Sequence, residues 1–255
     1  MTNPTYLSAC NLPPALIHLG HTTQIHYIGL GAPGTLTPLT SNINLQLTAS
    51  LTDDTLVGPG HLNALLIPGP DPNVVPDTPY LDFIRRHHAH GTQILAVCTG
   101  SFVLGHAGIL SGRVCTGPRL LVPLLRDRFP EAKEWVQSVR VVRDGNVWTS
   151  GLSFSFSSSF SFSFPLLFFP LLPENYISLY YVYSSREGAI TNGHDLIIQY
   201  LSTIASAPLV NAISIMADLP ARPVEYDTSV AGDTTHFVWQ VIKAVPSMLY
   251  WGFSR

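Results

Sequence analysis

Two short apolar runs constrain the fold of this chain more than any other feature. They are Leu62–Pro68 (LNALLIP) and Thr92–Val97 (TQILAV), and each is flanked by glycine, proline or small polar residues. Apolar runs of about four to eight residues in such a setting are typical of strands buried on both faces. Between them, Asp77 or Thr78 is expected to cap a helix that continues through His90. This strand–helix–strand order predicts a parallel sheet covered by helices.

Further segments extend the same pattern. Asp144-Gly145 predicts a two-residue hairpin turn, because this dipeptide tolerates the left-handed backbone that such turns require. The other expected elements are strands at Gln24–Leu30, Ile43–Leu47, Val139–Val142 and Asn146–Thr149, and a helix at Thr191–Ala205. The predicted fold class is α/β, a flavodoxin-like sandwich with a mainly parallel sheet and helices on both faces.

Composition narrows the class of protein. Of the 255 residues, 46% are hydrophobic and only 11% are charged, which predicts a packed core rather than disorder. The net charge of -3 gives no excess of positive charge, so we expect no nucleic-acid partner and no membrane partner. The three cysteines lack metal-ligand spacing, and the first residues lack the pattern of a signal peptide. We therefore expect a cytoplasmic protein with free thiols and no metal.

One segment departs from this pattern. Leu152–Leu172 (LSFSFSSSFSFSFPLLFFPLL) consists only of serine, phenylalanine, leucine and proline, which all have codons built from pyrimidines alone. The alternatives are a retained intron, a genuine loop, an extra strand and a membrane segment, although prolines and serines disfavour the last. Joining Gly151 to Gly188 or Ala189 would give a continuous strand and helix. We expect a single domain over residues 1–255, interrupted by an insertion at about 152–187.

The strongest chemical signal surrounds Cys98. The apolar strand runs directly into Cys98-Thr99-Gly100-Ser101, whose small residues permit a sharp turn into a helix. Such a nucleophile elbow holds a reactive side chain at the carboxyl end of a sheet, where ligands bind in these folds. The helix N-terminus is expected to favour the thiolate, and the Thr99 N–H is a candidate oxyanion donor. The alternative is that Cys98 is a small buried residue beside a glycine turn.

Three stretches carry a resemblance to a known family. They are AVCTGSFVLGHAGILSGR around Cys98, LLIPGPDP at Leu65–Pro72, and WTSG followed across the insertion by AITNGHDLIIQYL. Together they resemble the PfpI/ThiJ-type, class I glutamine amidotransferase-like proteins, and Cys98-Thr99-Gly100 is most similar to the isonitrile hydratase-like branch. The resemblance covers roughly Gln24 to Ala205 apart from the insertion.

The resemblance implies a role for each matching residue. Cys98 would be the nucleophile and Thr99 its polar partner in the pocket. Gly100 and Ser101 would complete the elbow, while backbone N–H groups around Gly69 and Asp71 would hold developing negative charge. The implied activity is a hydratase or hydrolase that attacks an electrophilic carbon of a small molecule without a cofactor. Dimers are common in this family, so a homodimer is one implied assembly.

The sequence also departs from that family. Pro70 stands where many relatives have a second glycine, and proline has no N–H to donate. Residues 1–15 contain no acidic residue, and the stretch Cys115–Pro118 contains no histidine. A non-catalytic thiol protein, such as a redox sensor or a protein-binding module, therefore remains the alternative function. A transcription regulator would need a helix-turn-helix partner, for which the tail after Ala207 is short and poor in Lys and Arg.

Other polar residues are given structural roles. His87, His88 and His90 are expected to lie at a solvated helix end rather than to bind a metal. His106 lies too far along the elbow helix to act as a base for Cys98, and Asp195 is expected to be structural.

Overall fold

The structure is a computed structural model that describes residues 25–38, 44–151, 189–219 and 222–227, and short stretches between 229 and 243. Residues 1–15, with Cys10, and the proposed insertion at 152–187 lie outside the described residues, as does Gln24. Expectations that concern those residues are therefore not tested by the fold.

A four-stranded sheet forms the centre of the molecule. Its strands are arranged in the order β5 (Ala64–Ile67), β6 (Gln93–Val97), β10 (Val147–Ser150) and β9 (Val141–Asp144). β6 is parallel to both neighbours, whereas β9 and β10 form the antiparallel hairpin that Asp144-Gly145 predicted. Gly145 has a φ of 63°, the left-handed backbone that such a turn needs. The sheet is therefore mainly parallel, as expected.

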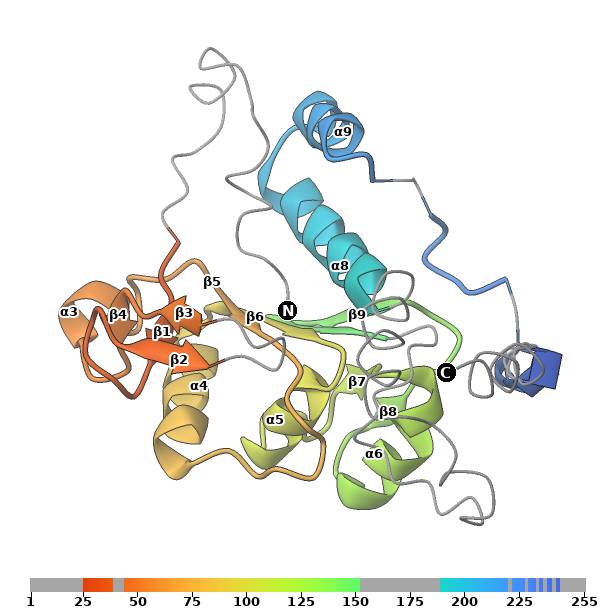
Figure 1. The fold of residues 1–255 in the computed structure, drawn as a ribbon, viewed down its shortest axis with the longest axis horizontal. Coiled ribbons are helices and arrows are strands. Elements are labelled where there is room, and N and C mark those ends of the chain that lie inside the picture. Colours follow the sequence, from red (N-terminus) through yellow and green to blue (C-terminus); the bar gives the residue numbers. More distant parts are fainter. Residues whose placement is uncertain are drawn as a thin grey trace, which may run out of the picture.

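Helices cover both faces of this sheet (Figure 1). α4 (Thr78–His90), α5 (Gly100–His106) and α6 (Val122–Arg128) lie on one face, and α8 (Ala189–Ile204) lies on the other, with α9 (Ala207–Met216) beyond it. Side chains alternate along β6 accordingly. Ile94 and Ala96 pack into the larger core with α4 and α5, while Leu95 and Val97 pack with Leu196 of α8. This arrangement confirms the flavodoxin-like α/β sandwich.

Shorter elements surround the central sheet. The strand pairs are β1 (Ile28–Gly29) with β4 (Ala49–Ser50), β2 (Leu36–Pro38) with β3 (Asn44–Gln46), and β7 (Val114–Cys115) with β8 (Glu134–Trp135); the short helices are α3 (Asp54–Val57) and η1 (Arg119–Leu121). β1 is shorter than the expected strand at Gln24–Leu30. Strands of two residues and a helix of four are too short to show a hydrophobic period, so β7, β8 and α3 had no sequence signal.

The histidine-rich end of α4 differs from its prediction. The helix itself has the expected bounds, and its inner face buries Leu81, Phe83 and Ile84. However, His87 is fully buried: its Nε2 lies 2.9 Å from the Val57 carbonyl oxygen and its Nδ1 lies 3.1 Å from Thr92 Oγ1. The expectation of a solvated helix end was therefore wrong for His87. Within the described residues, no three metal-ligating side chains cluster, and no helix is long and apolar enough to cross a membrane.

Candidate active site

Cys98 occupies a backbone conformation that few residues adopt. It follows β6 directly and precedes α5, and its φ is 57°. Among the described non-glycine residues, only Asp218 shares a positive φ. A left-handed backbone at a bulkier residue than glycine costs on the order of 1–3 kcal/mol, and such strain is common at functional sites. The geometry is that of a nucleophile elbow.

Close backbone packing holds the elbow in place. A Cβ added to Gly100 would lie 2.6 Å from the Ile67 carbonyl oxygen at the end of β5, so only glycine fits there. A Cβ added to Gly69 would overlap the Thr99 hydroxyl and lie 2.9 Å from the Thr99 nitrogen. The turn that follows β5 and the turn that follows β6 are therefore in direct contact, as parallel neighbours at one sheet edge should be.

The Thr99 hydroxyl joins these two turns. Its Oγ1 donates a hydrogen bond of 2.6 Å to the Pro70 carbonyl oxygen. Proline cannot donate an N–H, but here it contributes an acceptor instead. On either side of Pro70, the N–H groups of Gly69 and Asp71 make no hydrogen bond within the described part of the chain, and both residues are exposed. These two donors are open to a ligand.

Ser101 braces the elbow from inside the protein. It is fully buried, and its Oγ lies 3.2 Å from the Cys98 carbonyl oxygen and 3.1 Å from the Thr116 carbonyl oxygen. A hydroxyl has one proton, so the two carbonyls share it. Ser101 therefore supports the backbone of Cys98 and does not face the open turn. The structure brings Cys98, Thr99, Gly100, Gly69 and Asp71 together at one edge and places Ser101 beneath them.

The environment of Cys98 is apolar on its other side. The residue is partly buried and packs against a cluster formed by Leu95, Val97, Val141, Trp148 and Leu196. Burial raises the pKa of the Cys98 thiol, while hydrogen bonds from the Thr99 N–H and with the Thr99 hydroxyl act in the opposite direction. The helix N-terminus thus does not produce the lowered thiol pKa that the sequence predicted, because desolvation is the larger effect.

Polar residues that the sequence placed outside the site stay outside it. His106 lies at the far end of α5, with its ring edge-on to Phe129 at 5.1 Å. Asp195 Oδ2 pairs with the Arg222 guanidinium at 2.6 Å, in agreement with its expected structural role. Sequence reasoning missed Asn192 and Tyr226, which meet beside Gly151 at the end of β10. Their positions, more than thirty residues apart, share no local pattern that could have paired them.

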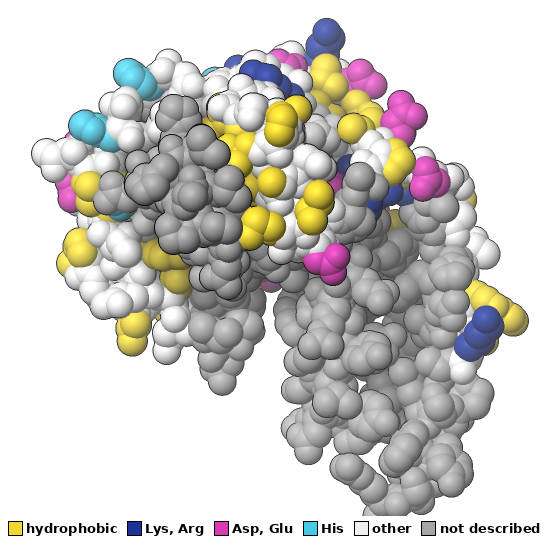
Figure 2. All heavy atoms as spheres, turned by 90° about the horizontal axis from the view of Figure 1, so that it is seen from above, with side chains coloured by type: hydrophobic (Ala, Val, Ile, Leu, Met, Phe, Trp, Pro, Cys, Tyr) yellow, Lys and Arg dark blue, Asp and Glu magenta, His cyan; other side chains and the backbone are white. Residues whose placement is uncertain are grey.

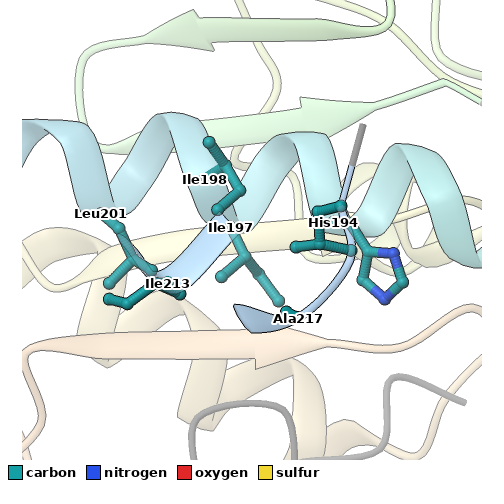
Figure 3. A pocket seen from close by; sticks show the side chains of 7 residues that line it. His194, Ile197, Ile198, Leu201, Ile213 and Ala217 are labelled. Atoms are coloured by element: carbon teal, nitrogen blue, oxygen red, sulfur yellow. The ribbon is translucent and has the colours of Figure 1, made fainter. Parts of the chain in front are cut away.

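Two cavities lie along α8 and α9. Figure 3 looks into one of about 20 Å³ between these helices, lined by isoleucine and leucine side chains with His194 at one end. A second cavity, of about 430 Å³, is lined by residues of α8 and α9 and by Arg222 and Val224. The surrounding face also exposes hydrophobic side chains (Figure 2), among them Ile204, Ile215 and Met216.

Comparison with known proteins identifies the family. The model of the DJ-1/PfpI family matches residues 21–161, which is more than half of the chain. The chain belongs to the DJ-1/PfpI family. The matched residues include the whole elbow around Cys98 and the turn after β5. The family match therefore covers the candidate site described above.

A curated relative and several solved structures are similar to this member of the DJ-1/PfpI family. An isonitrile hydratase from Pseudomonas putida is 39% identical over 120 residues, 46% of this chain and 49% of that enzyme, so the match spans about half of the relative's length. A ThiJ/PfpI family protein from Pseudomonas syringae aligns with a TM-score of 0.54 at 16% identity, over 90% of this chain and 76% of that one. An AraC family transcriptional regulator from Pseudomonas putida aligns with a TM-score of 0.51 at 16% identity, over 83% of this chain and 87% of that one. At these identities the structures show the fold alone.

Proposed function

We propose that this protein is a cysteine-dependent hydratase that acts on isonitriles, with Cys98 as nucleophile and Thr99 as its polar partner. The observation that carries the proposal is the elbow itself. A strained, partly exposed cysteine lies beside two exposed backbone N–H donors, at Gly69 and Asp71, that make no bond within the described residues. The similarity to an isonitrile hydratase over 120 residues supports the same substrate class.

The reaction divides into two balanced steps. In the first, the sulfur of Cys98 bonds to the terminal carbon of the isonitrile, and the thiol proton moves to the lone pair of that same carbon. The product is a thioimidate, in which the former isonitrile carbon carries one hydrogen and the sulfur. In the second, water adds to this carbon, the carbon–sulfur bond breaks, and the nitrogen takes up a proton. An N-substituted formamide leaves and the thiol is restored.

The raised pKa of Cys98 suits this substrate. An isonitrile carbon needs both a nucleophile and a proton, and a protonated thiol supplies both. The Thr99 hydroxyl has one proton, and both the Pro70 carbonyl oxygen and the Cys98 sulfur lie within its reach. With that proton on Pro70, the hydroxyl oxygen accepts the S–H and orients it; as the sulfur gives up its proton, the hydroxyl can turn and donate to the sulfur instead. In the second step oxygen replaces sulfur at the carbon. The N–H groups of Gly69, Asp71 and Thr99 would hold the negative charge that develops on that oxygen.

The test is a comparison of substrate classes with the purified full-length chain. An alkyl isonitrile, a 2-oxoaldehyde and a short primary amide are each incubated with the protein, and products are measured by chromatography and mass spectrometry. The proposal predicts a formamide from the isonitrile and no comparable turnover of the other two. Turnover of the amide or the oxoaldehyde alone would replace this activity with another thiol reaction.

The alternative function is a non-catalytic thiol protein on the same fold. The feature that favours it is the raised pKa of the Cys98 thiol, because a cysteine that must ionise on its own reacts slowly at neutral pH. Under this alternative none of the three substrates is consumed, while Cys98 still reacts with a small alkylating agent.

We further propose that residues 152–187 are an insertion into a single domain. Asn192 Nδ2, at the start of α8, donates a hydrogen bond of 3.0 Å to the carbonyl oxygen of Gly151, which directly follows β10. The two ends that flank the insertion therefore lie close enough for a short connection, which is the usual kind between a strand and a helix. A chain that lacks Leu152–Glu187 is expected to give a higher soluble yield and melting temperature. Unfolding of this shortened chain would contradict the proposal.

We also propose a cytoplasmic compartment and a homodimeric assembly. The two cysteines that the structure describes, Cys98 and Cys115, are both free thiols, which supports a reducing, cytoplasmic environment for the proposed enzyme. The proposed homodimer predicts a mass of about twice 27.8 kDa in light scattering. A monomer at the concentrations used for assay would contradict it.

A further inference from the structure

A segment near the end of the described chain is attached to the sheet beside the candidate site. Val139 and Glu225 form an antiparallel β-bridge, and the Tyr226 N–H donates a hydrogen bond of 2.9 Å to the Ser138 carbonyl oxygen. The Arg140 N–H also donates a hydrogen bond of 2.8 Å to the carbonyl oxygen of Val224. The segment Arg222–Tyr226, which we call the C-terminal clamp, thus runs alongside the residues that lead into β9.

The side chain of Tyr226 is the anchor of this clamp. Two guanidinium groups lie over its ring, Arg119 at 4.2 Å and Arg140 at 4.4 Å from the ring centroid. Both arginines are buried, where cation–π contacts are strongest. The Tyr226 hydroxyl accepts a hydrogen bond of 3.1 Å from Asn192 Nδ2, at the start of α8. One aromatic residue therefore connects η1, the approach to β9 and α8.

The Tyr226 hydroxyl is also packed against the sheet edge that carries Cys98. A Cβ added to Gly151 would lie 2.6 Å from the Tyr226 oxygen and 3.1 Å from the Gly117 carbonyl oxygen. Gly117 in turn adjoins Ser101, since a Cβ there would lie 3.5 Å from the Ser101 oxygen. Gly151 and Gly117 therefore form a series of close contacts between the tyrosine and the serine that supports the elbow.

Hydrogen bonds continue this path to Cys98. The Thr116 N–H donates a hydrogen bond of 2.8 Å to Thr149 Oγ1 of β10, and the Thr116 carbonyl oxygen accepts one from Ser101 Oγ. Ser101 shares its proton with the carbonyl oxygen of Cys98 itself. The turn at Thr116–Gly117 is therefore held between the C-terminal clamp on one side and the elbow on the other.

We propose that Tyr226 is a positioning residue for Cys98, and that the C-terminal clamp fixes the elbow through Gly151, Gly117, Thr116 and Ser101. The catalytic part of this inference rests on the proposed hydratase function. Removing the Tyr226 hydroxyl takes away one of the contacts of Asn192, which keeps its hydrogen bonds with Gly151 and Arg222, and it removes the oxygen packed against Gly151. The Thr116–Gly117 turn can then move away from Ser101. The strained backbone of Cys98 then loses part of its support, so the thiol is held less well for attack.

The test compares two variants, Tyr226→Phe and Tyr80→Phe. Tyr80 lies on α4, outside the C-terminal clamp, so its substitution is the control. For Tyr226→Phe we expect kcat for the isonitrile to fall about fivefold, the ratio that corresponds to ~1 kcal/mol for one hydrogen bond, with KM unchanged. Cys98 is expected to react with iodoacetamide about fivefold faster, because the elbow opens more readily. Tyr80→Phe should alter neither rate. Equal kcat and equal labelling in Tyr226→Phe and the wild type would overturn the proposal.

A second variant keeps the test independent of folding and of substrate. Asn192→Ala removes the partner of the same hydroxyl, so it should also speed Cys98 labelling, and the double variant should show no further increase. Additive effects in the double variant would contradict a shared contact. If no isonitrile is turned over by any form, the proposed function fails, whereas the labelling rates still decide whether Tyr226 positions Cys98.

Discussion

Cys98 and Cys115 both lie at the end of a strand, yet the structure places them in opposite situations. Cys98 follows β6 on a left-handed turn and is partly exposed, and the next residue, Thr99, contacts the turn at Gly69 and Pro70. Cys115 ends β7, is fully buried, and its Sγ lies 3.7 Å from the Arg113 carbonyl oxygen. Burial raises the pKa of both thiols, that of Cys115 to about 12. Access and backbone geometry, rather than the thiol pKa alone, therefore separate a candidate nucleophile from a core residue.

The same substitution at the two positions should have the largest contrasting effect on turnover. Cys98→Ser replaces the attacking sulfur with a much weaker nucleophile, so formamide production should fall by about 10³-fold or more. Cys115→Ser should retain turnover in its folded fraction. The measurement is initial rate per folded molecule, with circular dichroism to establish folding. Activity that survives in Cys98→Ser would show that the sulfur is not the nucleophile.

Alkylation should separate the two thiols next. We expect iodoacetamide to label Cys98 about a hundredfold faster than Cys115, because a fully buried thiol reacts only when the protein opens, at a cost of ~3 kcal/mol or more. Peptide mapping at several times gives both rates, and labelling in denaturant provides the control in which they converge. Faster native labelling of Cys115 or Cys10 would remove the distinction.

The elbow depends on a glycine, and the core cysteine does not. Gly100→Ala would place a methyl group against the Ile67 carbonyl oxygen, so we expect a loss of about 1–3 kcal/mol in the free energy of unfolding. Gly232→Ala is the control, because its Cβ meets only the exposed Ser229 hydroxyl. Urea unfolding measures both. An unchanged unfolding midpoint in Gly100→Ala would mean that β5 and the elbow are not in close contact.

For the free energy of unfolding the order of the two cysteines should reverse, with the larger loss on substitution of Cys115. Cys115→Ser puts a hydroxyl into a fully buried position and should cost about 1–2 kcal/mol. Cys98→Ser should cost less, because its side chain is partly exposed and the change is small. Both values come from urea unfolding curves. A larger loss at position 98 would indicate that its packing on the α8 side matters more than its access.

The last contrast concerns the pH dependence of stability, which appears only in alkaline solution. The Cys115 pKa is raised to about 12 in the folded state, whereas an unfolded thiol ionises near 8.5. Between these values the unfolded chain binds fewer protons, so stability falls as pH rises. Cys115→Ala should flatten this decline relative to the wild type, as measured by melting temperature from pH 8 to about 11. Parallel curves for the two proteins would mean that Cys115 does not contribute to it.

The sequence predicted those parts of the site that are local in the chain. The apolar run into Cys98 and the glycine at position 100 were sufficient for the elbow, since a buried strand followed by small residues has few other solutions. The Asp144-Gly145 hairpin and α4 were predicted for the same reason. Each depends on residues within a few positions of one another.

The remainder depends on contacts between distant residues. The thiol pKa is raised because Leu196 of α8 and Trp148 of β10 enclose an apolar cluster around Cys98, and nothing near Cys98 in the sequence signals that enclosure. Tyr226 was missed because it and its partners, Arg119, Arg140 and Asn192, are together spread over more than a hundred residues. The burial of His87 was missed because its partner Val57 lies on α3, which is only four residues long.

Trapping the thioimidate tests the central claim most directly. The full-length protein is mixed with an excess of an alkyl isonitrile, quenched in acid within the first turnover, digested and mapped by mass spectrometry. The proposed reaction predicts a mass increase equal to the whole isonitrile on the peptide that contains Cys98, and none on that of Cys115. Formamide production with no adduct on Cys98, or an adduct on Cys115 alone, would contradict the assignment of Cys98 as the nucleophile.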